Sequence, residues 1–512
     1  MKQFIRILFT LPAILVAGAC DSGFEEMNVN PNASIAVIPE YLFTNAQLSA
    51  VNVNYVGGAY LTIGQSMQHF ATYKEVPAAG DKYFNFSYST GTWNAYSGAV
   101  IQLSQVIDKV KDNPLYINKL AVARIWKAYL FHRLTDLYGD IPYVDAAKAL
   151  TDKDYSPVYD TQESIYSDLL NELATAIDSF DPAQATFGNS DLIYGGDITK
   201  WKKFAYSLML RLGMRLTQIN SGKAEEWVKK AIAGGVITND TDRALIAYVD
   251  GSQTASRNFI AAGLLSTDYV TPGGDNVEGG KFAKTLIDHL KNTGDPRLNV
   301  ISIVWIPNGT SFVADTTTAL QQGMPNAAYN SLPGNFNSFS EPNPATILKY
   351  NAPLIVLAPA EMHLLMAEAS LRGWYDGTTA AASYTAAVAS AMRQWALFGA
   401  GGVISESRIA KYLVNNPYTG GSFQDQMKQI QTQKWVSLFL EDEYEIFANW
   451  RRTGYPALQP TNYPGNLTGG KIPTRFVIPD SELLYNPDNY YMAVERQGGT
   501  NNLSSIVWWD VD

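Results

Sequence analysis

The amino-acid sequence predicts a mostly α-helical protein in which helices pack in pairs beside a long loop-rich region. In several segments apolar residues recur three and four positions apart, which is the period of an amphipathic helix. The range from about 236 to 358 is instead rich in Gly, Asn, Ser, Thr and Pro and has little helical periodicity. Because stacked helix pairs bury a continuous core, we expect one domain over residues 40–512, with a loop-rich insertion at about 236–358.

The first 19 residues have the pattern of a lipoprotein signal peptide. Lys2 and Arg6 precede a short apolar run, and small residues then lead to Cys20. The stretch AGAC is similar to a bacterial lipobox, although Ala17 stands where that pattern prefers Leu or Val. A plain secretory signal is the alternative. Since Cys20 is the only cysteine and stands where lipidation needs it, we expect it to carry the lipid (palmitate) that anchors the protein to a membrane.

The charge balance and the cysteine count exclude several classes of protein. A single cysteine rules out intrachain disulfides, cysteine zinc clusters and CxxC redox pairs. The net charge of −10 becomes −12 once Lys2 and Arg6 are removed, with 36 basic against 48 acidic residues. An acidic body disfavours broad contact with nucleic acid, so no nucleic-acid partner is expected. Residues 20–39 hold scattered Asn and Pro, which predicts an extended tether.

Helical segments are expected, in chain order, at 41–60, 61–70, 120–138, 163–180, 201–219, 225–233, 359–372, 377–397 and 433–456. Gly139 is placed to end one of them. Ala367 and Ala380, on either side of a turn at Gly373, would let two helices approach closely, as in tetratricopeptide-like units. The pairs are irregularly spaced, so the repeat signal in the sequence is weak.

Aromatic residues are unusually dense in the loop at 71–95, and a tryptophan lies in the loop-rich insertion. Tyr and Trp join an apolar face to a polar group, which suits sugar rings and peptides alike. The candidate ligand-binding residues are Tyr73, Tyr83, Tyr88, Trp93 and Trp305. Packing against the helical core is the alternative for each, because aromatics are mostly buried. It applies most to Trp93, which leads into a helix.

The segment 433–456 raises the question of catalysis, because it carries Glu441, Asp442, Glu443, Glu445, Arg451 and Arg452. Glu441 and Glu445, four apart on one predicted helix face, could supply the two carboxylates of a glycosidase. Ion pairs of Asp442 with Arg452 and of Glu443 with Arg451 are the alternative. Ion-pair networks often mimic active sites, so we expect scaffold pairing and no catalytic residue.

The sequence offers no convincing metal or cofactor site. His132 with Asp136, and His363 with Glu368, lie close in sequence but do not supply three converging ligands. No phosphate-binding or nucleophile motif is present. Arg211 and Arg215 lie four apart on one helix face and could grip an anion, but internal pairing is expected. We therefore expect neither a metal nor a cofactor.

Several stretches together resemble one known family. They are PEYLFTNAQ (39–47), LTDLYGDIPY (134–143), WKKFAYSLMLRLGMRL (201–216), AEASLRG (367–373), QKWVSLFLEDEYEIFANWRRTGYP (433–456), KIPTRFVIPDSELLYNPDNY (471–490) and WWD (508–510). In this order, behind a lipobox, they resemble the SusD/RagB family of nutrient-binding outer-membrane lipoproteins. Acidic residues just after Cys20 are similar to the surface-export signal of Bacteroidetes lipoproteins.

The resemblance implies a SusD-like fold without catalytic residues, anchored by Cys20 to the outer membrane and facing the cell exterior. It implies a SusC-like TonB-dependent transporter as partner, to which the protein hands its ligand. An oligosaccharide is the expected ligand, and a peptide, as in RagB-like proteins, is the alternative. A surface glycan hydrolase is a less favoured alternative, and a lid whose ligand contacts come mainly from the barrel is another.

Overall fold

The structure is a computed structural model that describes residues 38–72, 80–84, 90–149, 151–267, 269, 280–328 and 338–511. Residues 40–512 form one compact unit. The expected signal peptide, the lipid site at Cys20 and nearly all of the tether lie outside the described residues. Helices dominate this unit, so the prediction of a mostly α fold is confirmed. No helix in the described ranges is long and apolar enough to cross a membrane.

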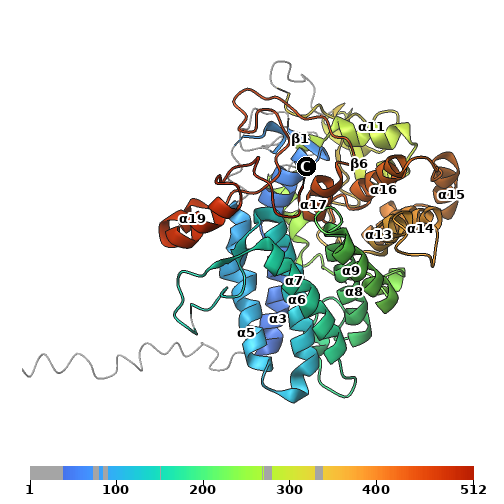
Figure 1. The fold of residues 1–512 in the computed structure, drawn as a ribbon. Helices are drawn as coiled ribbons and strands as arrows, with labels where there is room; N and C mark the ends of the chain where they lie inside the picture. Colours follow the sequence, from blue (N-terminus) through green and yellow to red (C-terminus); the bar gives the residue numbers. More distant parts are fainter. Residues whose placement is uncertain are drawn as a thin grey trace, which may run out of the picture. The chain divides into compact units, whose positions relative to one another are not determined.

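Consecutive helices pack against each other along the first half of the chain. They are α5 (Ile101–Val110), α6 (Ile117–Tyr138), α7 (Gln162–Ser179), α8 (Ile198–Arg215) and α9 (Ser221–Gly234), each beside the next (Figure 1). Their ends follow from local chemistry. The side chains of Thr161 and Asp197 accept backbone N–H groups at the starts of α7 and α8. Gly139 ends α6 at φ 80°, as its position predicted.

A second group of helices follows the loop-rich insertion. It consists of α13 (Pro359–Leu371), α14 (Ala380–Arg393), α15 (Glu406–Asn415), α16 (Phe423–Ser437) and α17 (Glu443–Thr453). α13 packs on α14, on α16 and on α8, and therefore joins the two groups (Figure 1). α18 (Asp480–Tyr485) and α19 (Pro487–Arg496) come last. The predicted helix pair at 359–372 and 377–397 is thus present with slightly shorter bounds.

Three predicted helices differ from the structure. The helices expected at 41–60 and 61–70 are α3 (Pro39–Asn52) and a π-helix (Tyr55–Gly64), divided at Asn54, where φ is 46°. The single helix expected at 433–456 is wrong, because α16 ends at Ser437 and α17 begins at Glu443. Leu440 lies between them at φ 59°, and the Asp442 side chain accepts the Glu445 N–H to start α17. A helix cannot continue through a left-handed residue.

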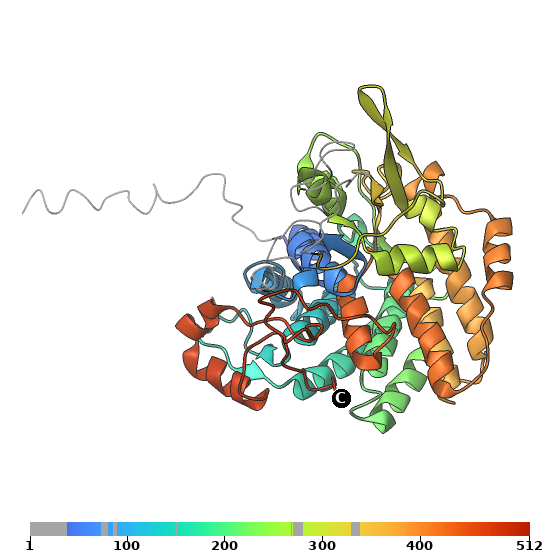
Figure 2. The ribbon, with the colours of Figure 1, turned by 90° about the horizontal axis from the view of Figure 1, so that it is seen from above.

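The insertion at 236–358 contains more regular structure than its composition suggested. Its helices are α10 (Phe259–Thr267), α11 (Lys284–Asn292) and α12 (Leu298–Ile301). Its strands form small antiparallel sheets: β4 (Ala244–Ile246) with β9 (Leu354–Leu357), β5 (Gly280–Phe282) with β1 (Phe70–Thr72), and β6 (Ser302–Asn308) with both β7 (Ser311–Asp315) and β8 (Glu341–Pro342). Figure 2 shows the β6–β7 hairpin projecting from the helices. Between α6 and α7, β2 (Ile141–Pro142) pairs with β3 (Tyr159–Asp160).

Candidate functional site

A cluster of charged side chains fills the space between α6, α8, α13, α16 and α17. Its members are each less than a tenth exposed and are here called the central charged cluster: Asp136, Glu361, Glu368, Asp442 and Glu445, with Arg133, Arg211, Arg215, Lys434 and Arg452. A buried charge is tolerated only when it is paired. The partners of these groups therefore decide whether the cluster is a reactive centre or a scaffold.

Two arginines of α8 connect the helices of the cluster. Arg211 places Nη2 2.5 Å from Glu361 Oε2 and Nη1 3.1 Å from Asp442 Oδ2. Arg215 places Nη2 2.5 Å from Glu445 Oε2, and Lys434 Nζ lies 2.7 Å from Glu445 Oε1. Both arginines are thus paired inside the fold rather than open to an anionic ligand.

Glu368 of α13 is the most densely bonded acid of the cluster. Arg452 donates from Nη1 and Nη2 to its two oxygens, each at 2.7 Å. Arg372 Nε donates at 2.9 Å and Gln431 Nε2 at 2.7 Å. Although burial disfavours the charged form, the charges and hydrogen bonds of Arg452 and Arg372 lower the pKa of Glu368 from 4.5 to about 2. The carboxylate is therefore ionised and fully committed to its partners.

The pairing within 433–456 is not the one expected from the sequence. Asp442 pairs with Arg133 and Arg211 instead of Arg452. Glu443 pairs with His69, whose Nδ1 lies 2.9 Å from its Oε2, instead of Arg451.

Arg451 donates to backbone carbonyl oxygens rather than to an acid of its own helix. Its Nη2 reaches the Asp136 oxygen at 2.7 Å and its Nη1 reaches the Thr474 oxygen at 2.9 Å. Asp442 and Glu443 stand at the start of α17, whereas Arg451 and Arg452 lie in its last turn, about 12–15 Å away along the helix axis. This separation is too long for an ion pair, so long-range partners replace the expected ones.

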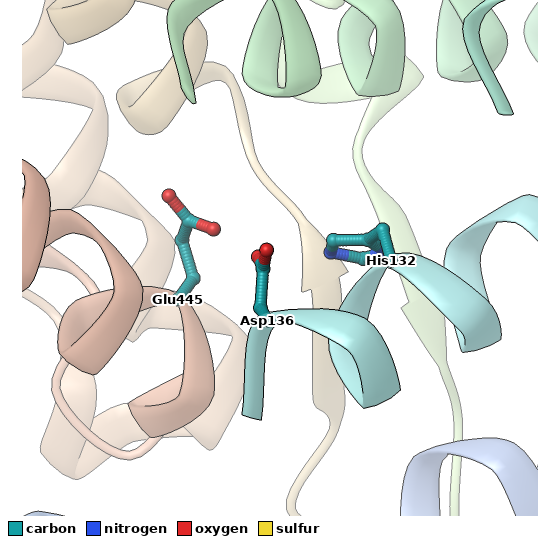
Figure 3. A group of neighbouring side chains, drawn as sticks. All are labelled: His132, Asp136 and Glu445. Carbon is teal, nitrogen blue, oxygen red and sulfur yellow. The ribbon is translucent and has the colours of Figure 1, made fainter. Parts of the chain in front are cut away.

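Figure 3 shows His132 and Asp136 of α6 beside Glu445 of α17, with ligand atoms that lie within 4.8 Å of one another. Three converging ligands of this kind could hold a metal ion. Here, however, Arg211 Nη1 lies 3.4 Å from His132 Nε2. Asp136 accepts the Trp509 indole N–H at 2.9 Å and lies 3.3 Å from Arg215. Guanidinium groups thus occupy the positions where a cation would sit, which is the arrangement of an ion-pair network.

The two carboxylates considered for glycoside hydrolysis do not form a catalytic pair. Glu441 lies in the break between α16 and α17, so it does not share a helix face with Glu445, contrary to expectation. Gln394 Nε2 donates to the Glu441 carboxyl group, and burial raises its pKa well above 4.5. The cavity beside it measures about 30 Å³, far smaller than a sugar site. Glu445 is held by Arg215 and Lys434.

Of the five candidate aromatic residues, Tyr73 and Tyr88 lie outside the described residues, and two others are packed in the core. Tyr83 is 1% exposed, and its carbonyl oxygen accepts the Leu467 N–H at 2.8 Å. Trp93 is 8% exposed and donates its indole N–H to Glu482 Oε1 at 3.1 Å. In this conformation neither of these two rings presents a face to a ligand.

Trp305 differs from these two because it is half-buried on β6, at the base of the projecting hairpin. Its indole N–H donates to the Glu341 carboxylate, and Lys281 Nζ lies 2.5 Å from Glu341 Oε2. Lys281 and Glu341 are themselves buried. The indole is therefore anchored to an acid that Lys281 pairs, while the residue as a whole stays partly exposed.

The sheets near Trp305 also bring together residues from distant parts of the sequence. Thr72 pairs with Gly280 across β1 and β5. Buried Asp81 accepts the Thr72 N–H at 3.2 Å and the Ala327 N–H at 2.9 Å. We call this region, from Asp81 through β1, β5 and β8 to the β6–β7 hairpin, the loop platform. It brings distant parts of the sequence to one place, as ligand-binding loops require.

Comparisons with known proteins agree with this fold. The profile of a SusD-like family, described as "Starch-binding associating with outer membrane", matches residues 31–479. This chain belongs to the SusD-like family. No curated protein sequence matches it. The SusD-like assignment made from the sequence motifs is thereby confirmed.

Solved structures support the same SusD-like fold. A chitin-binding protein is 30% identical with a TM-score of 0.81, and the match covers 93% of this chain and 100% of that protein. A chitin-binding SusD homologue from Flavobacterium johnsoniae is 23% identical with a TM-score of 0.75, over 92% and 98% of the two chains. A SusD homologue from Bacteroides fragilis is 22% identical with a TM-score of 0.76, over 93% and 99%.

Sequence reasoning missed the residues that support Trp305 in this SusD-like chain. Lys281 and Glu341 lie in unremarkable local sequence, and neither belongs to a motif. Glu341 is 36 residues from Trp305 and 60 from Lys281. No signal in the sequence pointed to these two residues, because no periodic pattern links positions this far apart.

Proposed function

We propose that this SusD-like protein captures an oligosaccharide at the cell surface and delivers it to a SusC-like TonB-dependent transporter in the outer membrane. The observation that carries the proposal is the 30% identity, over 93% of the chain, to a chitin-binding protein. The family description, starch-binding and associated with the outer membrane, supports the same class of ligand and location. The ligand is therefore a glycan, and chitin-derived oligosaccharides are the first to test.

The lipid anchor and the absence of catalysis belong to the same proposal. Cys20 would anchor the protein to the membrane after removal of residues 1–19. Residues 20–39 would form the tether between this anchor and the folded domain. Glu441, one of the two candidate catalytic acids, is buried and has a raised pKa. Glu445, the other, is paired with basic side chains. Binding and transfer, rather than hydrolysis, suit this arrangement.

The loop platform is the proposed glycan-binding surface. Trp305 offers a half-open indole face whose orientation is fixed through Glu341 and Lys281, and a fixed aromatic loses little entropy when a sugar stacks on it. Tyr73, which directly follows β1 in the sequence, and Tyr88 remain proposed contacts. Tyr83 and Trp93 would act only by supporting the surrounding packing.

Trp305→Ala tests the surface directly. Titration calorimetry with chito-oligosaccharides should show at least about a tenfold loss of affinity, since losing a buried aromatic contact of about 1.4 kcal/mol has that effect. Trp227→Ala is the matched control, because Trp227 is a half-buried tryptophan on α9. It should bind as wild type does.

Three results would contradict parts of the proposal. Unchanged affinity in the Trp305→Ala variant would remove the loop platform from the binding site. Binding of peptides in place of every glycan tested would favour the RagB-like alternative. Release of shorter sugars by the purified wild-type protein would establish a hydrolase.

A further inference from the structure

A separate cleft of about 570 Å³ lies between α5, α6 and the connection that follows β2. In Figure 1 this connection passes beside α5. The volume falls in the range of small-molecule sites. Apolar and charged side chains both line it, and they include Leu103, Ile107, Lys127, Phe131, Tyr143 and Val144. The loop platform shares none of these residues.

Lys127 of α6 is the unusual group in this cleft. Its Nζ lies 4.6 Å from the centroid of the Tyr143 ring and 5.6 Å from that of Phe131. Among the residues that the structure describes, no acid or carbonyl group pairs with its ammonium. The two other lysines of the lining differ, because Lys111 pairs with Asp108 and Lys148 with Asp145, each at 2.7 Å.

The two acids whose charges act on the pKa of Lys127 are already paired with other groups. Arg124 donates to both oxygens of Glu172, at 2.6 and 2.5 Å. The Tyr143 hydroxyl donates to Asp168 Oδ2 at 2.6 Å. Burial lowers the pKa of Lys127, against the opposing effect of Glu172 and Asp168. The ammonium is thus partly removed from water without gaining a hydrogen-bond acceptor from the protein.

We propose that this cleft binds a small organic ligand through a single carboxylate that accepts hydrogen bonds from Lys127. A charge-assisted bond of this kind supplies the acceptor that the ammonium lacks. The apolar body of the ligand lies along Leu103, Ile107 and Val144. This site is independent of the glycan site around Trp305.

The charges of the cleft select a monoanion. Lys127 offers one unpaired positive charge, whereas Asp112 and Asp152 stand exposed in the lining. A dianion such as phosphate would bring a second negative charge close to these acids, and like charges repel. One carboxylate matches one ammonium, and the apolar side chains of the lining add contact area that inorganic phosphate cannot use.

Such a carboxylate has two natural sources, the C-terminus of a short peptide and an acidic sugar. Ligand-observed NMR titrations with two matched pairs distinguish them: alanyl-leucine against its C-terminal amide, and glucuronic acid against glucose. We expect one acidic probe to bind at least tenfold more tightly than its neutral partner. The pair that shows the difference identifies the source.

Variants assign the effect to Lys127. Lys127→Met should abolish the preference for the acidic probe, whereas Lys127→Arg should keep it. Lys111→Met removes one positive charge from the same cleft, but from a lysine already paired with Asp108, and should bind as wild type does. Thermal unfolding checks that each variant is folded.

Several outcomes would overturn the proposal: no binding of any probe, equal binding of acidic and neutral partners, or an unchanged preference in folded Lys127→Met. The proposal would also be overturned if Lys127→Arg lost the preference for the acidic probe while Lys127→Met kept it. Glycan affinity at Trp305 is measured separately, so failure of one site leaves the other site's result intact.

Discussion

Replacing Glu368 with Gln should destabilise the protein in a way that depends on pH. Glu368 accepts four hydrogen bonds, two from Arg452 and one each from Arg372 and Gln431. Gln has the shape of a protonated glutamic acid but never carries its charge. The variant therefore removes the charge while preserving the volume, and leaves two arginine side chains without their counter-ion.

The expected magnitude follows from the pKa of Glu368, which falls from 4.5 to about 2 on folding. At roughly 1.36 kcal/mol per pH unit, this lowering is worth about 3.4 kcal/mol to the free energy of unfolding at pH 7. A lowered pKa stabilises the fold fully above pH 4.5, and the contribution disappears as pH falls through about 2. At pH 3 about 1.4 kcal/mol remains by the same linkage relation.

Urea unfolding of wild-type and Glu368→Gln protein at pH 7, 5 and 3 measures this difference. The free energy of unfolding of the variant should be about 3 kcal/mol lower than that of wild type at pH 7 and pH 5. At pH 3 the difference should be less than half of that. A deficit that is the same at all three pH values, or that is below about 1 kcal/mol at pH 7, would refute the reasoning, because the ionised carboxylate would then not be the stabilising group.

Two further variants test the assignment of packing and scaffold roles. Trp93→Ala should lower the free energy of unfolding in urea by about 3–5 kcal/mol, because it empties a core position. Its glycan affinity in calorimetry should stay that of wild type. A folded variant with weakened glycan binding would place Trp93 in the site. For Glu441 the pKa is raised, so wild type loses stability as pH rises above 4.5, and Glu441→Gln removes this loss. In thermal unfolding, the melting temperature of the variant relative to that of wild type should be higher at pH 8 than at pH 5. A relative melting temperature that is lower at pH 8 would mean that Glu441 is ionised and paired.

Much of the helical framework could be predicted from local sequence. Apolar spacing located α6, α7, α8 and the pair α13–α14 to within a few residues, and Gly139 marked the end of α6 correctly. Helix periodicity and capping depend on neighbours within one or two turns, and these neighbours are visible in the sequence. The ordered motifs along the chain also identified the family.

The break at Leu438–Asp442 could not be predicted in the same way. Apolar spacing continues across it, and Asp442 has the same side chain whether it caps a helix or lies within one. Whether the helix breaks before Asp442 or continues through it depends on what the following helix packs against. Here α17 packs on α16, α6 and the π-helix at Tyr55–Gly64, and these contacts outweigh the continuous local pattern.

The partners of buried charges and aromatics were decided by tertiary structure alone. Arg211 meets Glu361 from 150 residues away, and Trp93 meets Glu482 from 389 residues away. Trp93 and Trp305 are both aromatic residues in loop-rich sequence, and only the helix that follows Trp93 favoured its burial. Packing buried one and left the other half open, because burial is a property of the assembled core and not of the residue. The sequence alone indicated most of the helices and the family, whereas the tertiary structure decided which aromatic side chains are buried and which stay partly exposed.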